Sequence, residues 1–90
     1  MPILKIPTPL RPYAGGESSL SLPGEIVEDV LDAAVQAHPM LKKHLFNDSG
    51  QLRPYVNLFL DEDNLNQLEG LKTPLSASDT VLIIPSIAGG

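Results

Sequence analysis

The sequence predicts an α+β fold in which one main helix packs across one face of a mixed, four- to five-stranded sheet. Three observations support this fold: a helical apolar pattern over 25–37, alternating segments before and after it, and an apolar strand over 80–85. The chain has 90 residues, of which 42% are hydrophobic, and this suffices for one core. We expect a single domain over 1–85 and a flexible C-terminal tail over 86–90.

The first elements are predicted to form a β-hairpin. Residues 3–8 favour a short strand whose length is limited by prolines. Residues 10–16 favour a loop or wide turn, because Gly15 and Gly16 can take positive φ angles. Residues 17–22 alternate polar and apolar side chains, as a half-buried strand does, and they complete the hairpin.

An amphipathic helix is predicted over 25–37. Apolar side chains recur there at three- and four-residue steps, and acidic side chains gather towards the N-terminal end, where they favour the helix dipole. A second, short helix is expected over 39–45, with Pro39 in its first turn. These helices separate the predicted hairpin from the strands of the C-terminal half.

Two strands are predicted in the C-terminal half. Residues 53–60 alternate as a strand does, and residues 80–85 are apolar on both alternating sets, which indicates a central strand. Residues 65–75 are compatible with a short strand and a turn of helix. Parallel pairing of the first and last strands, with the helix over one face, gives the β-grasp, or ubiquitin-like, arrangement.

The alternation in the last strand also predicts a docking surface. If the helix covers Val81 and Ile83, then Leu82 and Ile84 point to the other face of the sheet. Together with Phe59 they would form an apolar patch for a partner protein. The alternative is that the domain itself covers both faces of this strand.

Composition and charge exclude several functions. The absence of cysteine rules out a disulfide framework, a cysteine-based zinc site and a thiol nucleophile. The net charge is −5, and Lys42, Lys43 and Arg53 are too few for a nucleic-acid patch, so neither nucleic acid nor a membrane is an expected partner. No apolar run approaches the length of a membrane span, and the N-terminus lacks a signal-peptide core. We therefore expect a cytoplasmic protein.

No arrangement of side chains in the sequence indicates catalysis or metal binding. A set of nucleophile, base and acid cannot be assembled. His38 and His44 are six positions apart, which does not place them on one helix face, and the acidic turn 61–63 lacks the ligands and the glycine of an EF-hand. We therefore expect a protein that is not an enzyme and that holds no metal and no cofactor.

The most informative feature is the ending of the sequence in Gly89 and Gly90. Two glycines weaken regular structure, and a tail without side chains fits a narrow channel. Such a tail would deliver the α-carboxylate of Gly90 to the active site of a partner. Gly89 would supply access, and Ile87 and Ala88 would set the approach.

The carboxylate of Gly90 needs activation before it can react as an electrophile. Adenylation by ATP converts it to a mixed anhydride, from which a nucleophile displaces AMP. The sulfur of a persulfide would give a thiocarboxylate, and the amine of a lysine would give an isopeptide bond. Neither reaction needs a catalytic side chain on the carrier.

A family resemblance supports this interpretation. Residues 81–90 combine a strand, a proline and a Gly-Gly ending, and Asp79 with Thr80 precede them as a turn. This combination resembles the MoaD/ThiS family of ubiquitin-like sulfur carriers. Further segments are similar to the carrier used in O-phosphoserine-dependent cysteine synthesis: 6–12, 15–16, 56–57 and 61–63.

The resemblance implies that Gly90 becomes a thiocarboxylate. An E1-like enzyme would adenylate it with ATP, and a donor of the rhodanese or cysteine-desulfurase type would supply sulfur. In the cysteine subgroup, the thiocarboxylate would attack an aminoacrylate made by a PLP-dependent cysteine synthase. A JAMM-type metalloprotease would then release cysteine and regenerate the carrier.

Several alternatives remain open at this point. Within the family, the chain also fits the small subunit of molybdopterin synthase and the thiamin-thiazole sulfur carrier. In a second class, a ubiquitin-like modifier, the same tail would be conjugated to lysines of target proteins. In a third, a plain β-grasp interaction domain, the tail would have no role.

Overall fold

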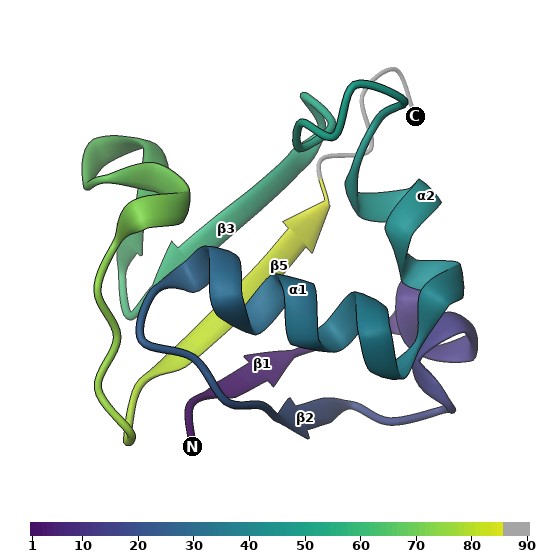
Figure 1. Ribbon diagram of the computed structural model, residues 1–90, viewed down its shortest axis with the longest axis horizontal. Coiled ribbons are helices and arrows are strands. Elements are labelled where there is room, and N and C mark those ends of the chain that lie inside the picture. The colour runs from purple at the N-terminus through teal and green to yellow at the C-terminus, as the bar shows by residue number, and fades with distance from the viewer. Residues whose placement is uncertain (86–90) are drawn as a thin grey trace.

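A five-stranded mixed sheet with a helix across one face organises the chain (Figure 1). The computed structural model describes residues 1–85, and residues 86–90 lie outside the described part. The strand order is β2-β1-β5-β3-β4, in which β1 and β5 pair in parallel and the other neighbours are antiparallel. The strands are β1 (Ile3–Lys5), β2 (Ser19–Ser21), β3 (Val56–Leu60), β4 (Asp63–Asn64) and β5 (Thr80–Pro85).

This architecture confirms the predicted α+β fold and the parallel pairing of the first and last strands. The main helix, α1, lies across the sheet, and the shorter α2 follows it beside the N-terminal segment (Figure 1). Four 3₁₀ helices complete the described part. The helices are α1 (Val27–Ala37), α2 (Lys42–Leu45), η1 (Thr8–Ala14), η2 (Pro39–Leu41), η3 (Leu65–Gln67) and η4 (Gly70–Lys72).

The helix α1 begins two residues later than the sequence pattern predicts. Ile26 is extended, with φ −132° and ψ 165°, so it precedes the helix as its N-cap residue. A carboxylate oxygen of Asp29 accepts hydrogen bonds from the backbone N–H groups of Glu25 and Ile26, at 3.1 and 3.4 Å. These bonds satisfy two backbone donors just before the first turn, where the helix itself offers no partner.

The predicted loop over 10–16 is mostly helical, which corrects the sequence-based expectation. The 3₁₀ helix η1 starts after Pro7 and ends at Gly15, whose φ of 67° stops it. Prolines near its start are tolerated because the N–H groups there have no partner within a helix. The burial of Leu10 and Ala14 in the core supplies the tertiary contacts that favour this helix over a loop.

The C-terminal half also departs from the prediction in detail. The strand β3 starts at Val56 rather than at residue 53, since a turn closed by the Val56 N–H and the Arg53 carbonyl precedes it. Residues 61–64, expected as a turn only, include the short strand β4. The stretch 65–75 forms two 3₁₀ turns, η3 and η4. The strand β5 has the predicted bounds.

The hydrophobic core lies between α1 and the face of the sheet that this helix covers. The helix contributes four side chains that are fully buried: Val27, Val30, Leu31 and Ala34. The three central strands contribute the facing side chains, each at most 7% exposed: Leu4, Val56, Leu58, Val81 and Ile83. The strand β5 lies in the middle of the sheet, and no helix of residues 1–85 lies on the opposite face (Figure 1).

Candidate functional site

The strand β5 divides its side chains between two environments. Val81 and Ile83 are 0% and 3% exposed and lie in the core, whereas Ile84 is 43% exposed. Leu82 is half-buried and pairs directly with the half-buried Phe59 of β3, which places both on the same face as Ile84. We call Phe59, Leu82 and Ile84 the open-face patch. The structure thus brings together the three residues that the sequence analysis singled out on this strand pair.

Polar side chains border the open-face patch. Lys5 lies opposite Leu82 on the neighbouring β1, and Asn57 lies opposite Ile84 on β3. Thr80 precedes the patch on β5 itself. An apolar centre with a polar border is the usual composition of a protein–protein interface.

The patch lies at the end of β5 from which the last residues continue. Ile84 directly precedes Pro85, the last described residue, which pairs with Val56 at the edge of the ladder between β3 and β5. A partner that covers the patch therefore sits beside the point where residue 86 is attached. The predicted tail positions Ile87, Ala88, Gly89 and Gly90 lie outside the described residues.

The histidines and acidic groups do not form a site within the described part of the chain. Across residues 1–85, no group of three or more His, Cys, Asp or Glu side chains is placed to hold a metal ion. His44 stacks on Tyr13 with ring centroids 4.0 Å apart, and its buried Nε2 has no hydrogen-bond partner there. Lys72 donates a 2.8 Å hydrogen bond to Glu28, and this contact raises the pKa of Lys72 above its ordinary value.

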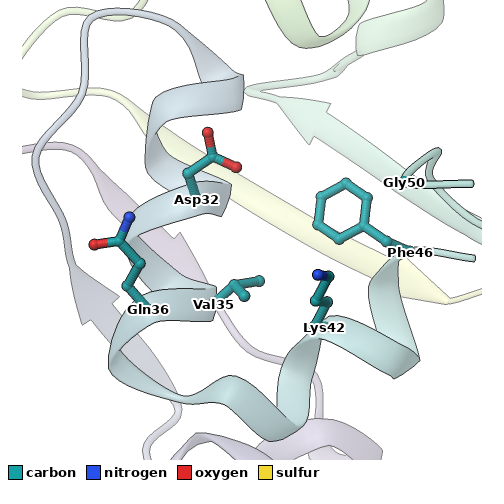
Figure 2. A pocket seen from close by; sticks show the side chains of 6 residues that line it. All are labelled: Asp32, Val35, Gln36, Lys42, Phe46 and Gly50. Carbon is teal, nitrogen blue, oxygen red and sulfur yellow. The ribbon is translucent and has the colours of Figure 1, made fainter. Parts of the chain in front are cut away.

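Two hollows lie on the side of the molecule that carries α2. Figure 2 shows the smaller one, of about 320 Å³, between Asp32, Val35 and Gln36 of α1 on one side and Lys42 and Phe46 on the other. The larger one, of about 610 Å³, continues past Lys42 and Phe46 along α2.

These hollows are not predictable from the sequence pattern. In the sequence, Lys42, Lys43 and Arg53 indicate only a basic cluster that is too small for nucleic acid. The adjacent Lys42 and Lys43 are visible in the sequence, but the return of the following loop to the same helix depends on a tertiary contact. No helix among residues 1–85 has both the length and the apolar character needed to cross a bilayer.

The strand order and the helix across the sheet define a β-grasp, or ubiquitin-like, domain, and the sequence after it ends in Gly89 and Gly90. Residues 4–90 match the ThiS family, and the chain belongs to this family of ubiquitin-like sulfur carriers. The match includes the described β5 as well as the Gly-Gly ending. The predicted family resemblance is therefore confirmed.

Individual relatives point to two kinds of protein. The chain is 32% identical over 89 residues to the sulfur carrier protein CysO of Mycobacterium tuberculosis, covering 97% of this chain and 96% of the relative. A chain in the crystal structure of the Amycolatopsis orientalis BexX/CysO complex superposes with a TM-score of 0.89 and 29% identity over 100% of both chains. The solution structure of small archaeal modifier protein 1 from Methanosarcina acetivorans superposes with a TM-score of 0.89 and 34% identity. The match covers 99% of this chain and 95% of that one.

Proposed function

We propose that this protein carries sulfur as a thiocarboxylate on the C-terminal Gly90, and that it donates this sulfur in cysteine biosynthesis. The observation that supports the proposal most directly is the family match, which extends through the Gly-Gly ending at residue 90. The similarity to CysO over 97% of the chain favours the cysteine branch over the other branches of the family. The open-face patch supports it further, because it presents apolar side chains beside the end of β5, as a docking partner would require.

The proposed activation proceeds in two displacements. A carboxylate oxygen of Gly90 attacks the α-phosphorus of ATP and releases pyrophosphate. Sulfide, or the terminal sulfur of a persulfide, then attacks the acyl carbon and displaces AMP. With sulfide the product is the thiocarboxylate itself; with a persulfide the product is an acyl disulfide, from which a second thiol releases the thiocarboxylate.

The partners follow from this chemistry. An E1-like adenylating enzyme would bind ATP and dock on Phe59, Leu82 and Ile84. A donor of the rhodanese or cysteine-desulfurase type would supply the persulfide. In the cysteine branch, the thiocarboxylate sulfur would add to the aminoacrylate of a PLP-dependent cysteine synthase, and a JAMM-type metalloprotease would cleave the resulting amide after an S-to-N acyl shift. The carrier itself would contribute no catalytic side chain and would bind no cofactor.

Intact mass spectrometry tests the carrier chemistry. The protein is incubated with ATP, sulfide and an E1-like enzyme from its own cells. We expect a gain of about 16 Da, nominally the same as oxidation of one methionine, so fragmentation must localise the gain to Gly90. A variant lacking Gly90 is the matched control and should show no gain, with an unchanged amide spectrum. An unmodified Gly90 after reaction with each activating enzyme of those cells would overturn the proposal.

The acceptor requires a separate assay. Isolated thiocarboxylate is mixed with O-phosphoserine and the PLP-dependent synthase, and we expect a carrier–cysteine adduct that the metalloprotease cleaves to free cysteine. The proposed role in cysteine biosynthesis would be wrong if the synthase formed no adduct and sulfur were transferred to a molybdopterin precursor or a thiazole precursor instead. The chain would then belong to the corresponding branch of the family.

A protein modifier is the second candidate, and the similarity to small archaeal modifier protein 1 favours it. In this case a lysine amine, rather than sulfur, displaces AMP from the adenylate of Gly90. The discriminating observation is the stability of the products in cell extract. Conjugates that survive thiol reductant and carry Gly90 on lysine indicate modification, whereas unconjugated protein with sulfur at Gly90 indicates thiocarboxylate chemistry.

A further inference from the structure

A groove along α2 gathers half of the cationic side chains of an acidic protein. The chain has six lysines and arginines against eleven acids, and three of the six line this groove. Apolar side chains and the polar loop 47–50 form the remainder of its wall. We define the α2 groove by six lining residues: Pro39, Met40, Lys42, Lys43, Phe46 and Arg53.

The fold positions Arg53 at this groove although it lies ten residues from Lys43. Its Nε donates a 2.7 Å hydrogen bond to the Lys43 carbonyl, and its backbone N–H donates to the Leu45 carbonyl at 2.9 Å. An isolated bridge pairs Phe46 with Leu52. The Asn47 side chain closes the intervening loop by accepting two backbone hydrogen bonds, at 2.9 and 3.0 Å. These contacts hold the guanidinium in place before any ligand arrives, which lowers the ordering cost of binding.

The groove cations have no ionic partners within residues 1–85, where the sole ion pair joins Lys72 and Glu28. Asp48 is the one acid in the lining, and Asp32 lies across the adjoining hollow from Lys42 without pairing with it (Figure 2). The groove is therefore a local positive region on a molecule whose net charge is −5.

An apolar surface accompanies these charges. Met40 is 52% exposed, and Phe46 is half-buried beside it in the lining. A methionine thioether and an aromatic ring adapt well to an inserted side chain. A ligand that consists only of phosphates would leave this apolar surface unused and would also face Asp48.

We propose that the α2 groove binds an acidic segment of a partner protein that carries one apolar anchor residue. The carboxylates of the segment pair with Lys42, Lys43 and Arg53, and the anchor packs on Met40 and Phe46. Outside the groove the chain carries three cations against ten acids, so the remaining surface disfavours such a segment and the charge pattern favours one docking orientation. Nucleic acid is disfavoured because three cations neutralise too few phosphates.

The position of the groove suits a partner that also reaches the end of β5. The Arg53 carbonyl accepts from the Val56 N–H at 3.0 Å, and Val56 pairs with Pro85. The loop after α2 lies at the same end of the molecule as the end of β5 (Figure 1). The groove and the open-face patch use different residues, so the segment would add a second contact to a partner docked on the sheet. The proposal requires no chemistry at Gly90.

Peptide titration followed by amide chemical shifts tests the proposal on the full chain without any enzyme. The probe is a capped octapeptide of aspartate and glutamate with one central leucine. We expect saturable shifts confined to 39–53. Replacement of the leucine by serine, or of the acids by lysine, should weaken or abolish them. A hexauridylate RNA at the same concentration should give no saturable shift.

Two matched pairs of variants locate the binding energy. The double change K42Q/K43Q should weaken binding of the acidic peptide about fivefold to tenfold, since each exposed ion pair contributes modestly to the binding free energy. The control K5Q/K72Q removes the same charge elsewhere and should change affinity less than about twofold. M40Q should weaken binding of the leucine peptide, whereas L68Q, which alters an exposed apolar side chain outside the groove, should not.

Specific outcomes would overturn the proposal. Equal losses in K42Q/K43Q and K5Q/K72Q would show that net charge alone attracts the peptide. Shifts on the open-face patch instead of 39–53 would place the peptide elsewhere. Shifts of 39–53 that depend on protein concentration without peptide would identify a second copy of this chain as the occupant, and preferential RNA binding would identify nucleic acid.

Discussion

Ile83 and Ile84 are neighbours of one residue type on one strand, yet they belong to different parts of the molecule. Ile83 is 3% exposed under α1, whereas Ile84 is 43% exposed on the face without a helix. Strand alternation alone separates them. The comparison shows that β5 builds the core with one set of side chains and presents a candidate docking surface with the other. Changes on the two faces should therefore affect different measurements.

The largest expected effect is on stability, from the covered face. Ile83→Ala removes buried methyl and methylene groups and leaves a cavity beneath α1, so it should lower the free energy of unfolding by roughly 2–5 kcal/mol. The matched Ile84→Ala change removes the same atoms from the open face, and it should cost less than about 1 kcal/mol. Urea denaturation of both variants measures the difference.

Equal destabilisation by the two alanine variants would contradict the division of β5 into two faces. A small loss for Ile83→Ala with an unchanged denaturant slope would mean that the core collapses into the vacated space. A large loss for Ile84→Ala would mean that part of the chain covers the open face in solution.

This division was predictable from the sequence because it depends only on local alternation. The apolar run 80–85 fixes the central strand, and its alternation separates Val81 and Ile83 from Leu82 and Ile84. Which of these two sets α1 covers is given by the structure. The helix η1 was not predictable in the same way. Prolines at 7, 9 and 12 favour a loop locally, and only the burial of Leu10 and Ala14 against the core makes the helix favourable.

The α2 groove could also not be predicted from the sequence. Lys42 and Lys43 are adjacent in sequence, but Arg53 joins them through a loop that its own side chain helps to close. No local pattern signals a return over ten residues, since the contact depends on the three-dimensional path of the chain. In such a loop the tertiary structure, rather than local conformational propensity, determines which charged side chains lie close together.

A second prediction addresses the open face through binding. Leu82→Asp combined with Ile84→Asp should leave the protein folded, as judged by its amide spectrum. The double change should weaken association with the proposed activating enzyme by at least about tenfold, since it puts two charges into the apolar centre. Leu68→Asp is the control, because Leu68 is 42% exposed and lies outside the sheet. Titration calorimetry with the enzyme measures the dissociation constant of each variant.

Two results of this affinity measurement would contradict the predicted role of the open-face patch. Unchanged affinity in the doubly substituted protein would exclude Leu82 and Ile84 from the interface, even if Gly90 still became modified. Equal weakening by Leu68→Asp would indicate that added negative charge, rather than the apolar patch, controls association.

The smallest expected effect comes from the exposed ion pair on the outer side of α1. Glu28 raises the pKa of Lys72 above 10.5, its ordinary value, so the pair stabilises the fold fully below that value. This stabilisation is lost as the pH rises through the raised pKa. Lys72→Met should therefore be slightly less stable than the parent protein at about pH 7, and the two should converge as the pH rises above the raised pKa of Lys72.

Urea denaturation of both proteins across this pH range measures the convergence. Both side chains are well exposed, so water and salt screen the pair, and the difference at neutral pH should be far smaller than for Ile83→Ala. A difference comparable to that of Ile83→Ala would mean that the ion pair, rather than apolar contact, holds α1 on the sheet. A difference that persists unchanged at high pH would instead assign the effect to packing by the Lys72 side-chain stem.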